Sequence, residues 1–501
     1  MVLSQIPDAE TAAAGHVALD GRRMTVADVV ALAEGDKAAP ALDPAAVARV
    51  ERSWLAAAQV AATGRVYGRS TGVGANRTLA VAAEDAEGHG LRLLRSHAGA
   101  VGDRVPARET RAMLAVRLNQ LLAGGAGLRP DVVTALAEAL RAGAYPVVHE
   151  YGAVGTGDLA ALAQTGLALV GEHTWEGGPP PAPIALGTGD ALALISSNAL
   201  TLGQAALALH ELRGLLRATH AVAALSLLAV GGSLEAYAAP VHAARPHPGA
   251  VRSAAEMRRL LGVPDLPAPP AGSRIQDPYG FRCIPQIQGP ALDAADALER
   301  VLETEFNAAA ENPLISADGP GGPSAWHHGN FFAGHVALAL DAFRLALLQT
   351  AQLSAARLSA LADPGLTGLR PFLADGPSAG SGVMILEYAA GGALAELRTC
   401  ATPATLGNAV LSRGVEEQAS FASQAARLTL RAAPAYRQVL ACELVTALRA
   451  LRQHALLPDA DRPVGQAYAA AAEVLSMDMA DRPLTGDVAA AAALLDALGA
   501  L

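Results

Sequence analysis

The sequence predicts a mainly α-helical protein, an elongated bundle of long helices with a smaller mixed, loop-rich N-terminal part. Of its 501 residues, 52% are hydrophobic and only 17% are charged, so the chain must bury much of its surface. Aromatic residues make up only 4%, and a core of Ala, Leu and Val favours tight helix-on-helix packing. A stripe with 4, 3 and 4 spacing marks a bundle helix at Val336, Leu340, Phe343 and Leu347.

The elements follow in order from periodicity and turn signals. A strand-like piece at His16–Leu19 and a helix at Val26–Glu34 open the chain. Further helices are predicted over residues 44–62, 84–95, 107–123, 130–142, 158–171, 190–217, 291–309, 334–362, 384–398 and 415–455. Asp158 is placed to cap the helix that begins there. Prolines make residues 239–290 the least regular stretch, and so long a loop is usually functional.

These elements suggest two domains. We expect residues 1–190 to form the loop-rich part and residues 191–501 to form the long-helix bundle. Residues 173–189, which include three successive prolines, connect them over the surface. Helices of about 25–35 residues exceed the usual length and suit an oligomer built by bundling.

Charge and cysteine content exclude several classes of protein. A net charge of −10 gives no indication of nucleic-acid binding. The cysteines are odd in number and far apart, as expected of free thiols in a reducing compartment. Residues 1–14 lack the apolar run of a signal peptide, and the uncharged stretch 191–209 carries polar residues that suit a soluble core. We therefore expect a cytoplasmic protein without a membrane segment.

Metal and phosphate sites are not indicated. His327 and His328 are adjacent, so their side chains point to opposite sides, and we interpret them as surface or packing histidines. The glycines of residues 72–74 and 155–157 lack the lysine of a phosphate loop and the strand–helix frame of a dinucleotide fold. No metal ligands are therefore assigned.

Two polar stretches carry residues suited to chemistry. Tyr67 begins a glycine-rich loop that ends at Gly74, where it is either an exposed acid–base group or the anchor of a turn. Residues 274–286 hold Tyr279 and Arg282 in irregular chain. A guanidinium there is suited to clamp a carboxylate, and the alternative is a surface loop with salt bridges.

A third stretch, Gly155-Thr156-Gly157, is able to react with itself. Attack of the Gly157 nitrogen on the Gly155 carbonyl, with loss of water, closes an imidazolone ring. Loss of the Thr156 hydroxyl then leaves an exocyclic alkene, which is an electrophile. The alternative is a plain loop before a helix capped by Asp158, and spacing alone favours that alternative.

Together these stretches resemble the histidine and aromatic amino-acid ammonia-lyase and aminomutase family. The matching motifs are the Tyr67 loop, residues 276–286, Asn307 with Glu311-Asn312-Pro313, Gly329-Asn330-Phe331, and Ser381-Gly382 with Met384. The resemblance implies a long-helix bundle assembled as a homotetramer, with each active site drawn from three chains. It implies elimination of ammonia from an α-amino acid, or transfer of the amine to the β-carbon. The electrophile is methylidene-imidazolone (MIO), which the family makes from Ala-Ser-Gly without an external cofactor.

The resemblance also assigns roles to residues. Tyr67 becomes the base that removes the β-proton, Tyr279 assists at the amine and the electrophile, and Arg282 binds the substrate carboxylate. Asn312 and Phe331 belong to the substrate pocket. His97 and Glu416 lie where the histidine-using branch grips an imidazole through both ring nitrogens. From the residues alone, a helix-end histidine and a solvated carboxylate are the simpler interpretations of these two positions.

The sequence departs from the family at the electrophile. Gly155 replaces Ala and makes the backbone more flexible where ring closure requires it to be compressed. The entropic cost relative to Ala is about 1 kcal/mol. Thr156 replaces Ser and adds a methyl group at the carbon that substrate must attack. Ser196 stands where the family has the Asn that steadies the oxyanion, although Asn198 follows two residues later.

Three hypotheses follow from this pattern. The first is a carbon–nitrogen lyase acting on histidine or a related α-amino acid, with catalytic Tyr67, Tyr279 and Ser196 and an MIO-like group made from residues 155–157. The second is a family member without MIO that catalyses a different elimination or cyclisation in specialised metabolism. The third is a ligand-binding pseudo-enzyme. Lyase and aminomutase use the same residues, so the sequence does not choose between them.

Overall fold

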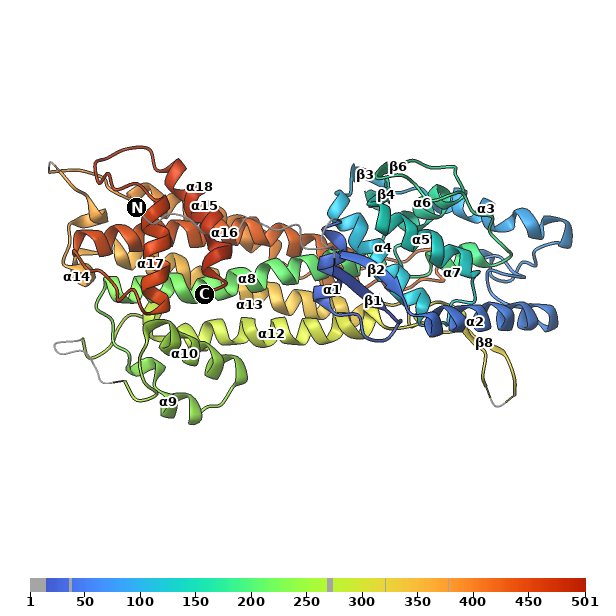
Figure 1. Ribbon diagram of the computed structural model, residues 1–501, viewed down its shortest axis with the longest axis horizontal. Coiled ribbons are helices and arrows are strands. Elements are labelled where there is room, and N and C mark those ends of the chain that lie inside the picture. Colours follow the sequence, from blue (N-terminus) through green and yellow to red (C-terminus); the bar gives the residue numbers. More distant parts are fainter. Residues whose placement is uncertain (1–14, 36–37, 268–273, 320, 377) are drawn as a thin grey trace. The chain divides into compact units, whose positions relative to one another are not determined.

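A computed structural model describes residues 15–35, 38–267, 274–319, 321–376 and 378–501 (Figure 1). The chain divides into two compact units, each assembled from separate stretches of sequence. Unit 1 comprises Met1–Leu207, Glu299–Leu340 and Pro403–Arg427, and unit 2 comprises Ala208–Leu298, Asp341–Thr402 and Leu428–Leu501. The domain boundary expected near residue 190 stays a prediction.

Unit 1 combines short helices with small sheets. Its helices are α1 (Val26–Ala33), α2 (Pro44–Thr63), α3 (Ala86–His97), α4 (Ala107–Leu122), α5 (Pro130–Ala142), α6 (Leu159–Leu169) and α7 (Asp190–Ile195). Its strands are β1 (Gly15–Leu19), β2 (Ala38–Leu42), β3 (Val101–Arg104), β4 (Ala144–Pro146), β5 (His149–Tyr151), β6 (Trp175–Gly177), β7 (Leu314–Ser316) and β8 (Ser324–Trp326). The pair β1–β2 is parallel, and β3–β5, β4–β6 and β7–β8 are antiparallel.

Long helices dominate the rest of the described chain. The elements are α8 (Ala199–Ala229), α9 (Ala239–Ala243), α10 (Pro248–Leu261), α11 (Tyr279–Arg282), α12 (Ile284–Phe306), α13 (Gly334–Leu361), α14 (Pro364–Thr367), α15 (Met384–Cys400), α16 (Ala422–Gln453), α17 (Pro463–Val474) and α18 (Thr485–Leu498). Helices α8, α12, α13 and α16 contribute residues to both units. The mainly helical fold class is confirmed.

Local sequence explains where several helices begin and end. Thr25 and Asp28 form a reciprocal capping box at the start of α1. Asp43 accepts a hydrogen bond from the Ala45 amide at the start of α2, where Pro44 holds the first helical position. Gly143 ends α5 with a φ of 71°, a left-handed conformation that favours glycine.

The core of unit 2 contains a buried polar cluster between α8, α13 and α16. The Glu443 carboxylate is fully buried and accepts hydrogen bonds from Arg357 Nε at 2.6 Å and Nη2 at 2.8 Å. Ser226 and Ser354 donate to the same carboxylate at 2.7 and 2.5 Å. Every carboxylate oxygen is thus satisfied, which a buried charge requires.

The structure corrects the prediction for residues 239–290. This stretch is largely helical, containing α9, α10, α11 and the start of α12. The reason is that Pro240 and Pro248 occupy first-turn positions, where proline initiates a helix because the missing N–H has no helical partner. Residues 268–273 of this stretch, like residues 1–14 at the N-terminus, lie outside the described residues.

Two predicted helix boundaries are also wrong. The helix expected at 190–217 is two helices, α7 and α8, separated by residues 196–198, whose polar side chains bond elsewhere instead of continuing the helix. The helix expected from 415 begins at Ala422, and Leu411 and Glu416 pair as an isolated bridge before it. Both irregular segments contribute to the site described below.

By length and composition, Asp190–Ala229 and Gly334–Leu361 are apolar enough to cross a membrane. The most apolar window of the first stretch is wholly buried within the protein, and that of the second is about half buried, at 56%. Buried core helices of this composition meet the same criteria.

Candidate active site

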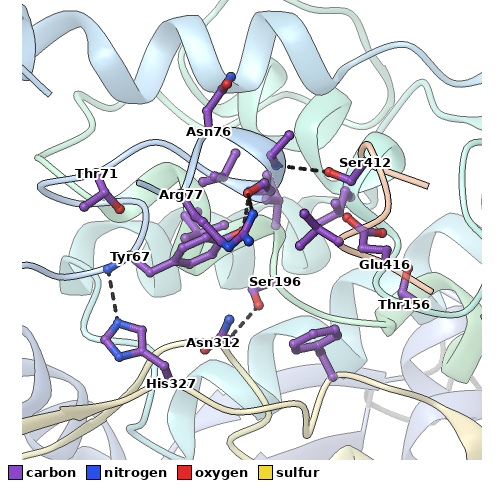
Figure 2. Close-up of a pocket in the computed structure, with 18 of the residues that line it drawn as sticks. Tyr67, Thr71, Asn76, Arg77, Thr156, Ser196, Asn312, His327, Ser412 and Glu416 are labelled. Atoms are coloured by element: carbon purple, nitrogen blue, oxygen red, sulfur yellow. Dashed lines mark hydrogen bonds between the residues drawn. The ribbon is translucent and has the colours of Figure 1, made fainter. Parts of the chain in front are cut away.

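A cavity of about 920 Å³ lies within unit 1 (Figure 2). Its walls come from residues 65–77, 97, 156–159, 192–196, 312, 327–331 and 412–416. The cavity therefore brings together Tyr67, His97, Thr156, Ser196, Asn312, Phe331 and Glu416, seven of the residues singled out from the sequence. Segments separated by more than 300 positions in the sequence share one wall, which only tertiary folding achieves.

Tyr67 lies on the loop after α2 and faces the cavity (Figure 2). Its hydroxyl oxygen accepts a hydrogen bond from the Gly74 amide at 2.7 Å, and its own amide donates to His327 Nε2 at 3.2 Å. Burial is the main cause that raises the pKa of Tyr67. The hydrogen bond from Gly74 acts to lower this pKa, and the charge of Glu416 acts to raise it further. The next residue, Gly68, has a φ of 68°, and a Cβ atom at this position would clash with the Leu192 side chain.

The backbone at residues 155–157 turns sharply beside Thr156. Gly155 and Gly157 have φ values of 85° and 117°, which side chains rarely allow. The Gly155 carbonyl accepts hydrogen bonds from Ser420 Oγ at 2.8 Å and from the Ala333 amide at 3.2 Å. The Gly157 amide donates to Asn198 Oδ1 at 3.0 Å. Both groups required for ring closure are thus held by hydrogen bonds.

Ser196 and Asn198, in the break between α7 and α8, have different partners. Ser196 Oγ accepts a hydrogen bond from the Asn312 amide at 3.1 Å, at the cavity wall. Asn198 holds Gly157 through its side-chain oxygen and donates from Nδ2 to the Phe331 carbonyl at 2.7 Å. Asn198, which the sequence left open, is therefore the amide that contacts the triplet.

His97 and Glu416 both line the cavity, as the resemblance implied. His97 ends α3, and its Nδ1 lies 3.0 Å from the Leu93 carbonyl oxygen and 3.0 Å from Ser96 Oγ. A carbonyl accepts only, so the neutral ring carries its proton on Nδ1, which leaves Nε2 as an acceptor. Asn312 Oδ1 accepts a hydrogen bond from the His328 amide at 3.0 Å.

Asp158 does not cap α6 with its side chain, contrary to expectation. Its carboxylate instead accepts hydrogen bonds from the Thr201 amide at 2.7 Å and the Thr201 hydroxyl at 2.9 Å, in the first turn of α8. In the folded chain, the first turn of α8 lies within hydrogen-bond reach of the Asp158 carboxylate, which therefore binds α8 and not the first turn of α6. Complete burial raises the pKa of Asp158 to about 6.

The sequence did not identify several residues of the cavity. His327 and His328 line it, and His327 is exposed and accepts a hydrogen bond from the Tyr67 amide. Arg77, Asn76 and Ser412 also line it, and no motif marked them. Among the described residues, no group of three or more His, Cys, Asp and Glu side chains is arranged to hold a metal ion.

Tyr279 and Arg282 lie in unit 2 and are not among the residues that line this cavity. The Arg282 guanidinium stacks over the Tyr279 ring, 4.5 Å from its centroid, and Arg282 Nε donates to the Asp277 carbonyl at 2.9 Å. Tyr279 is 64% exposed. The two residues therefore form a local pair, available on the surface of their own unit.

Comparisons with known proteins agree with this fold. The pattern of the aromatic amino acid lyase family matches residues 24–475. Histidine ammonia-lyase of Geobacillus thermodenitrificans is 35% identical over 96% of this chain and 97% of its own. The structure of histidine ammonia-lyase from Trypanosoma cruzi has a TM-score of 0.86 and 26% identity, covering 96% of this chain and 93% of that one. Tyrosine aminomutase from Streptomyces globisporus has a TM-score of 0.89 and 26% identity, covering 96% and 97%.

The fold is that of a helical enzyme whose cavity is lined by Tyr67 and Thr156, and near full-length similarity makes it a carbon–nitrogen lyase. The chain belongs to the aromatic amino acid lyase family, as the motifs predicted. Its activity is therefore elimination of the ammonia-lyase type.

Proposed function

We propose that the enzyme removes ammonia from histidine or a closely related α-amino acid in the unit 1 cavity. The observation that carries this proposal is the meeting of Tyr67, Thr156, His97 and Glu416 around one space. These residues supply a base, the side chain of the electrophile-forming triplet and two acceptors for the N–H groups of an imidazolium ring. The 35% identity to a histidine ammonia-lyase supports the same substrate class.

The triplet fits an MIO-like group. Its two glycines adopt the positive φ values of a tight turn, and Thr156 lines the cavity. Before ring closure, the Asn198 side chain and the Ser420 hydroxyl bind the triplet at its two flanks, through the Gly157 N–H and the Gly155 carbonyl oxygen. Such a group supplies an electrophilic carbon that draws electrons from the substrate. No external cofactor is part of this proposal.

Tyr67 is proposed as the base that removes the β-proton. The Gly74 amide hydrogen bond favours the phenolate, but burial raises the pKa of Tyr67 above its ordinary value. The free enzyme therefore holds Tyr67 as the neutral phenol at pH 7. A bound substrate ammonium would stabilise the phenolate, because an opposite charge nearby lowers the pKa of an acid.

His97 and Glu416 are proposed to select the imidazole ring. With its proton on Nδ1, the His97 ring accepts at Nε2, and the Glu416 side chain accepts through its carboxylate oxygens. Two acceptors match the two N–H groups of an imidazolium, so the pair favours the protonated ring. Ser196, Asn312 and Phe331 complete the proposed pocket.

Arg282 and Tyr279 are proposed to bind the substrate carboxylate and amine. Both residues lie in unit 2. The family resemblance implies a homotetramer, in which Tyr279 and Arg282 of another chain would complete each active site. The exposed pair of Tyr279 with Arg282 supports this role. We also propose a cytoplasmic location, because all three cysteines are free.

The second candidate is elimination or cyclisation without MIO, and Gly155 and Thr156 favour it because both depart from Ala-Ser-Gly. Intact mass and peptide mapping of residues 151–162 decide between the two. A deficit of two waters, with ammonia and an unsaturated acid released from histidine, supports the first proposal. An unmodified mass with turnover of a related amino acid supports the second. An unmodified mass with binding and no turnover supports a pseudo-enzyme.

A further inference from the structure

The Gly155 carbonyl receives two hydrogen bonds, an arrangement that polarises it. Ser420 Oγ donates at 2.8 Å and the Ala333 amide donates at 3.2 Å. Ser420 is 5% exposed, so its hydroxyl acts in a site that excludes water. Two fixed donors on one carbonyl oxygen are the arrangement that stabilises an oxyanion when that carbonyl is attacked.

The attacking group is held as well. The Gly157 amide donates to Asn198 Oδ1, and Asn198 is fixed by its own hydrogen bond to the Phe331 carbonyl at 2.7 Å. Asn198 is also 5% exposed. A donor–acceptor chain therefore orients the nitrogen of residue 157, while a separate pair of donors acts on the carbonyl of residue 155.

Gly155 is sterically matched to this arrangement. A Cβ at this position would lie 2.1 Å from Ser420 Oγ and 2.7 Å from the Ala422 amide nitrogen. Because atoms cannot approach so closely, Ala at position 155 and the Ser420 hydrogen bond are incompatible in this geometry. The replacement of Ala by Gly in the triplet thus accompanies the approach of Ser420.

We propose that Ser420, together with the Ala333 amide, is the catalytic oxyanion hole for ring closure at Gly155-Thr156-Gly157. This inference rests on the proposed function, since it requires that the triplet cyclises. It assigns a role to a side chain that no sequence motif marked. Ser420 touches a reacting atom, the oxygen that leaves.

The step balances without an oxidant or reductant. The Gly157 nitrogen forms a bond to the Gly155 carbonyl carbon, and the carbonyl electron pair moves to the oxygen held by Ser420. That oxygen leaves as water with the protons of the Gly157 and Thr156 amides, which closes the ring with a C=N bond. The Thr156 hydroxyl then leaves with the Cα proton as a second water.

The test follows cyclisation by mass in the full-length protein. Wild type, Ser420→Ala, Ser420→Cys and Ser423→Ala are sampled at fixed times after a pulse of synthesis, and residues 151–162 are mapped. Ser423 is the matched control, because its hydroxyl donates to the Ala153 carbonyl at 2.9 Å, two residues before Gly155. Circular dichroism and thermal unfolding check that each variant is folded.

We expect the two-water deficit to form about 100-fold more slowly in Ser420→Ala, which loses one oxyanion donor. Ser420→Cys, with a weak donor of similar size, is expected to fall between this variant and wild type. Ser423→Ala is expected to cyclise at the wild-type rate. If Ser420→Ala is misfolded, Ser420→Cys carries the comparison.

Three results would overturn the inference. Normal cyclisation of folded Ser420→Ala or Ser420→Cys removes Ser420 from the reaction but leaves the proposed function intact. Equal slowing in Ser423→Ala assigns the effect to packing of this segment. An unmodified wild-type protein overturns both the inference and the proposed electrophile, and turnover of histidine then tests the remaining proposal separately.

Discussion

The carboxylate of Asp158 caps the start of α8 through Thr201, although Asp158 directly precedes α6 in the sequence. It accepts from the Thr201 amide at 2.7 Å and from the Thr201 hydroxyl at 2.9 Å. The residue is 1% exposed. This contact fixes Asp158, the residue after Gly157, to the start of α8, and so it helps to position residues 155–157.

The pH dependence of stability is expected to report on Asp158. Its folded-state pKa is raised from 3.8 to about 6 by burial, so the folded state binds the proton more tightly than the unfolded state. The free energy of unfolding should therefore fall as pH rises from about 4 through 6, by on the order of 3 kcal/mol from this group. Urea unfolding measured across this range should show the fall in wild type.

Asp158→Asn removes the titrating group and serves as the comparison. Its unfolding free energy is expected to be flatter than that of wild type between pH 4 and 6, since the variant retains no proton to exchange at this position. Parallel pH profiles for the two proteins would show that another group causes the change.

The alkaline limb of activity is expected to depend on Tyr67. The base acts as the phenolate, and burial raises the pKa of Tyr67 above 10.0, so kcat/KM, once corrected for titration of the free substrate, should increase with pH without a plateau below pH 10. Tyr67→Phe should lower kcat by about 100- to 10,000-fold with substrate binding retained. Ammonia release and calorimetric binding measure the two quantities. An unchanged alkaline limb in Tyr67→Phe would remove this residue as the base.

Substrate selection is expected to depend on Glu416. Glu416→Gln keeps the shape and removes the charge, so the KM for histidine should rise about 10- to 100-fold, the value of a hydrogen bond to a charged group. The exposed neighbour Glu417 provides the matched control as Glu417→Gln. Steady-state kinetics with histidine and phenylalanine check the result. A similar rise for phenylalanine, or in the control variant, would contradict selection of an imidazole.

Restoring the family's Ala at position 155 is expected to damage the protein. Gly155→Ala places Cβ 2.1 Å from Ser420 Oγ at a φ of 85°, and overpacking of this kind costs about 1–3 kcal/mol. Gly99→Ala is the control, because no atom lies within 4 Å of the added carbon there. Thermal unfolding of both variants measures the cost. Equal stability of the two would show that the triplet relaxes freely.

Much of the fold followed from the sequence by itself. The stripe from Val336 to Leu347 predicted α13, and the helix predicted over residues 130–142 matches α5 at both ends. Such local signals act over one or two helical turns, so they are legible in order along the chain. The resemblance also named seven of the residues that line the cavity, from Tyr67 to Glu416, because a resemblance carries long-range information that periodicity lacks.

Only the tertiary structure decided how the triplet is held. Gly157 bonds to Asn198 across 41 positions, and Gly155 bonds to Ser420 across 265. Asp158 serves α8 and not α6 for the same reason: a buried polar group takes the partner that the packed fold places nearest to it. The sequence alone determined the helical fold and pointed to the candidate site residues, while packing determined the hydrogen-bond partners, since these depend on distances that spacing along the chain does not encode.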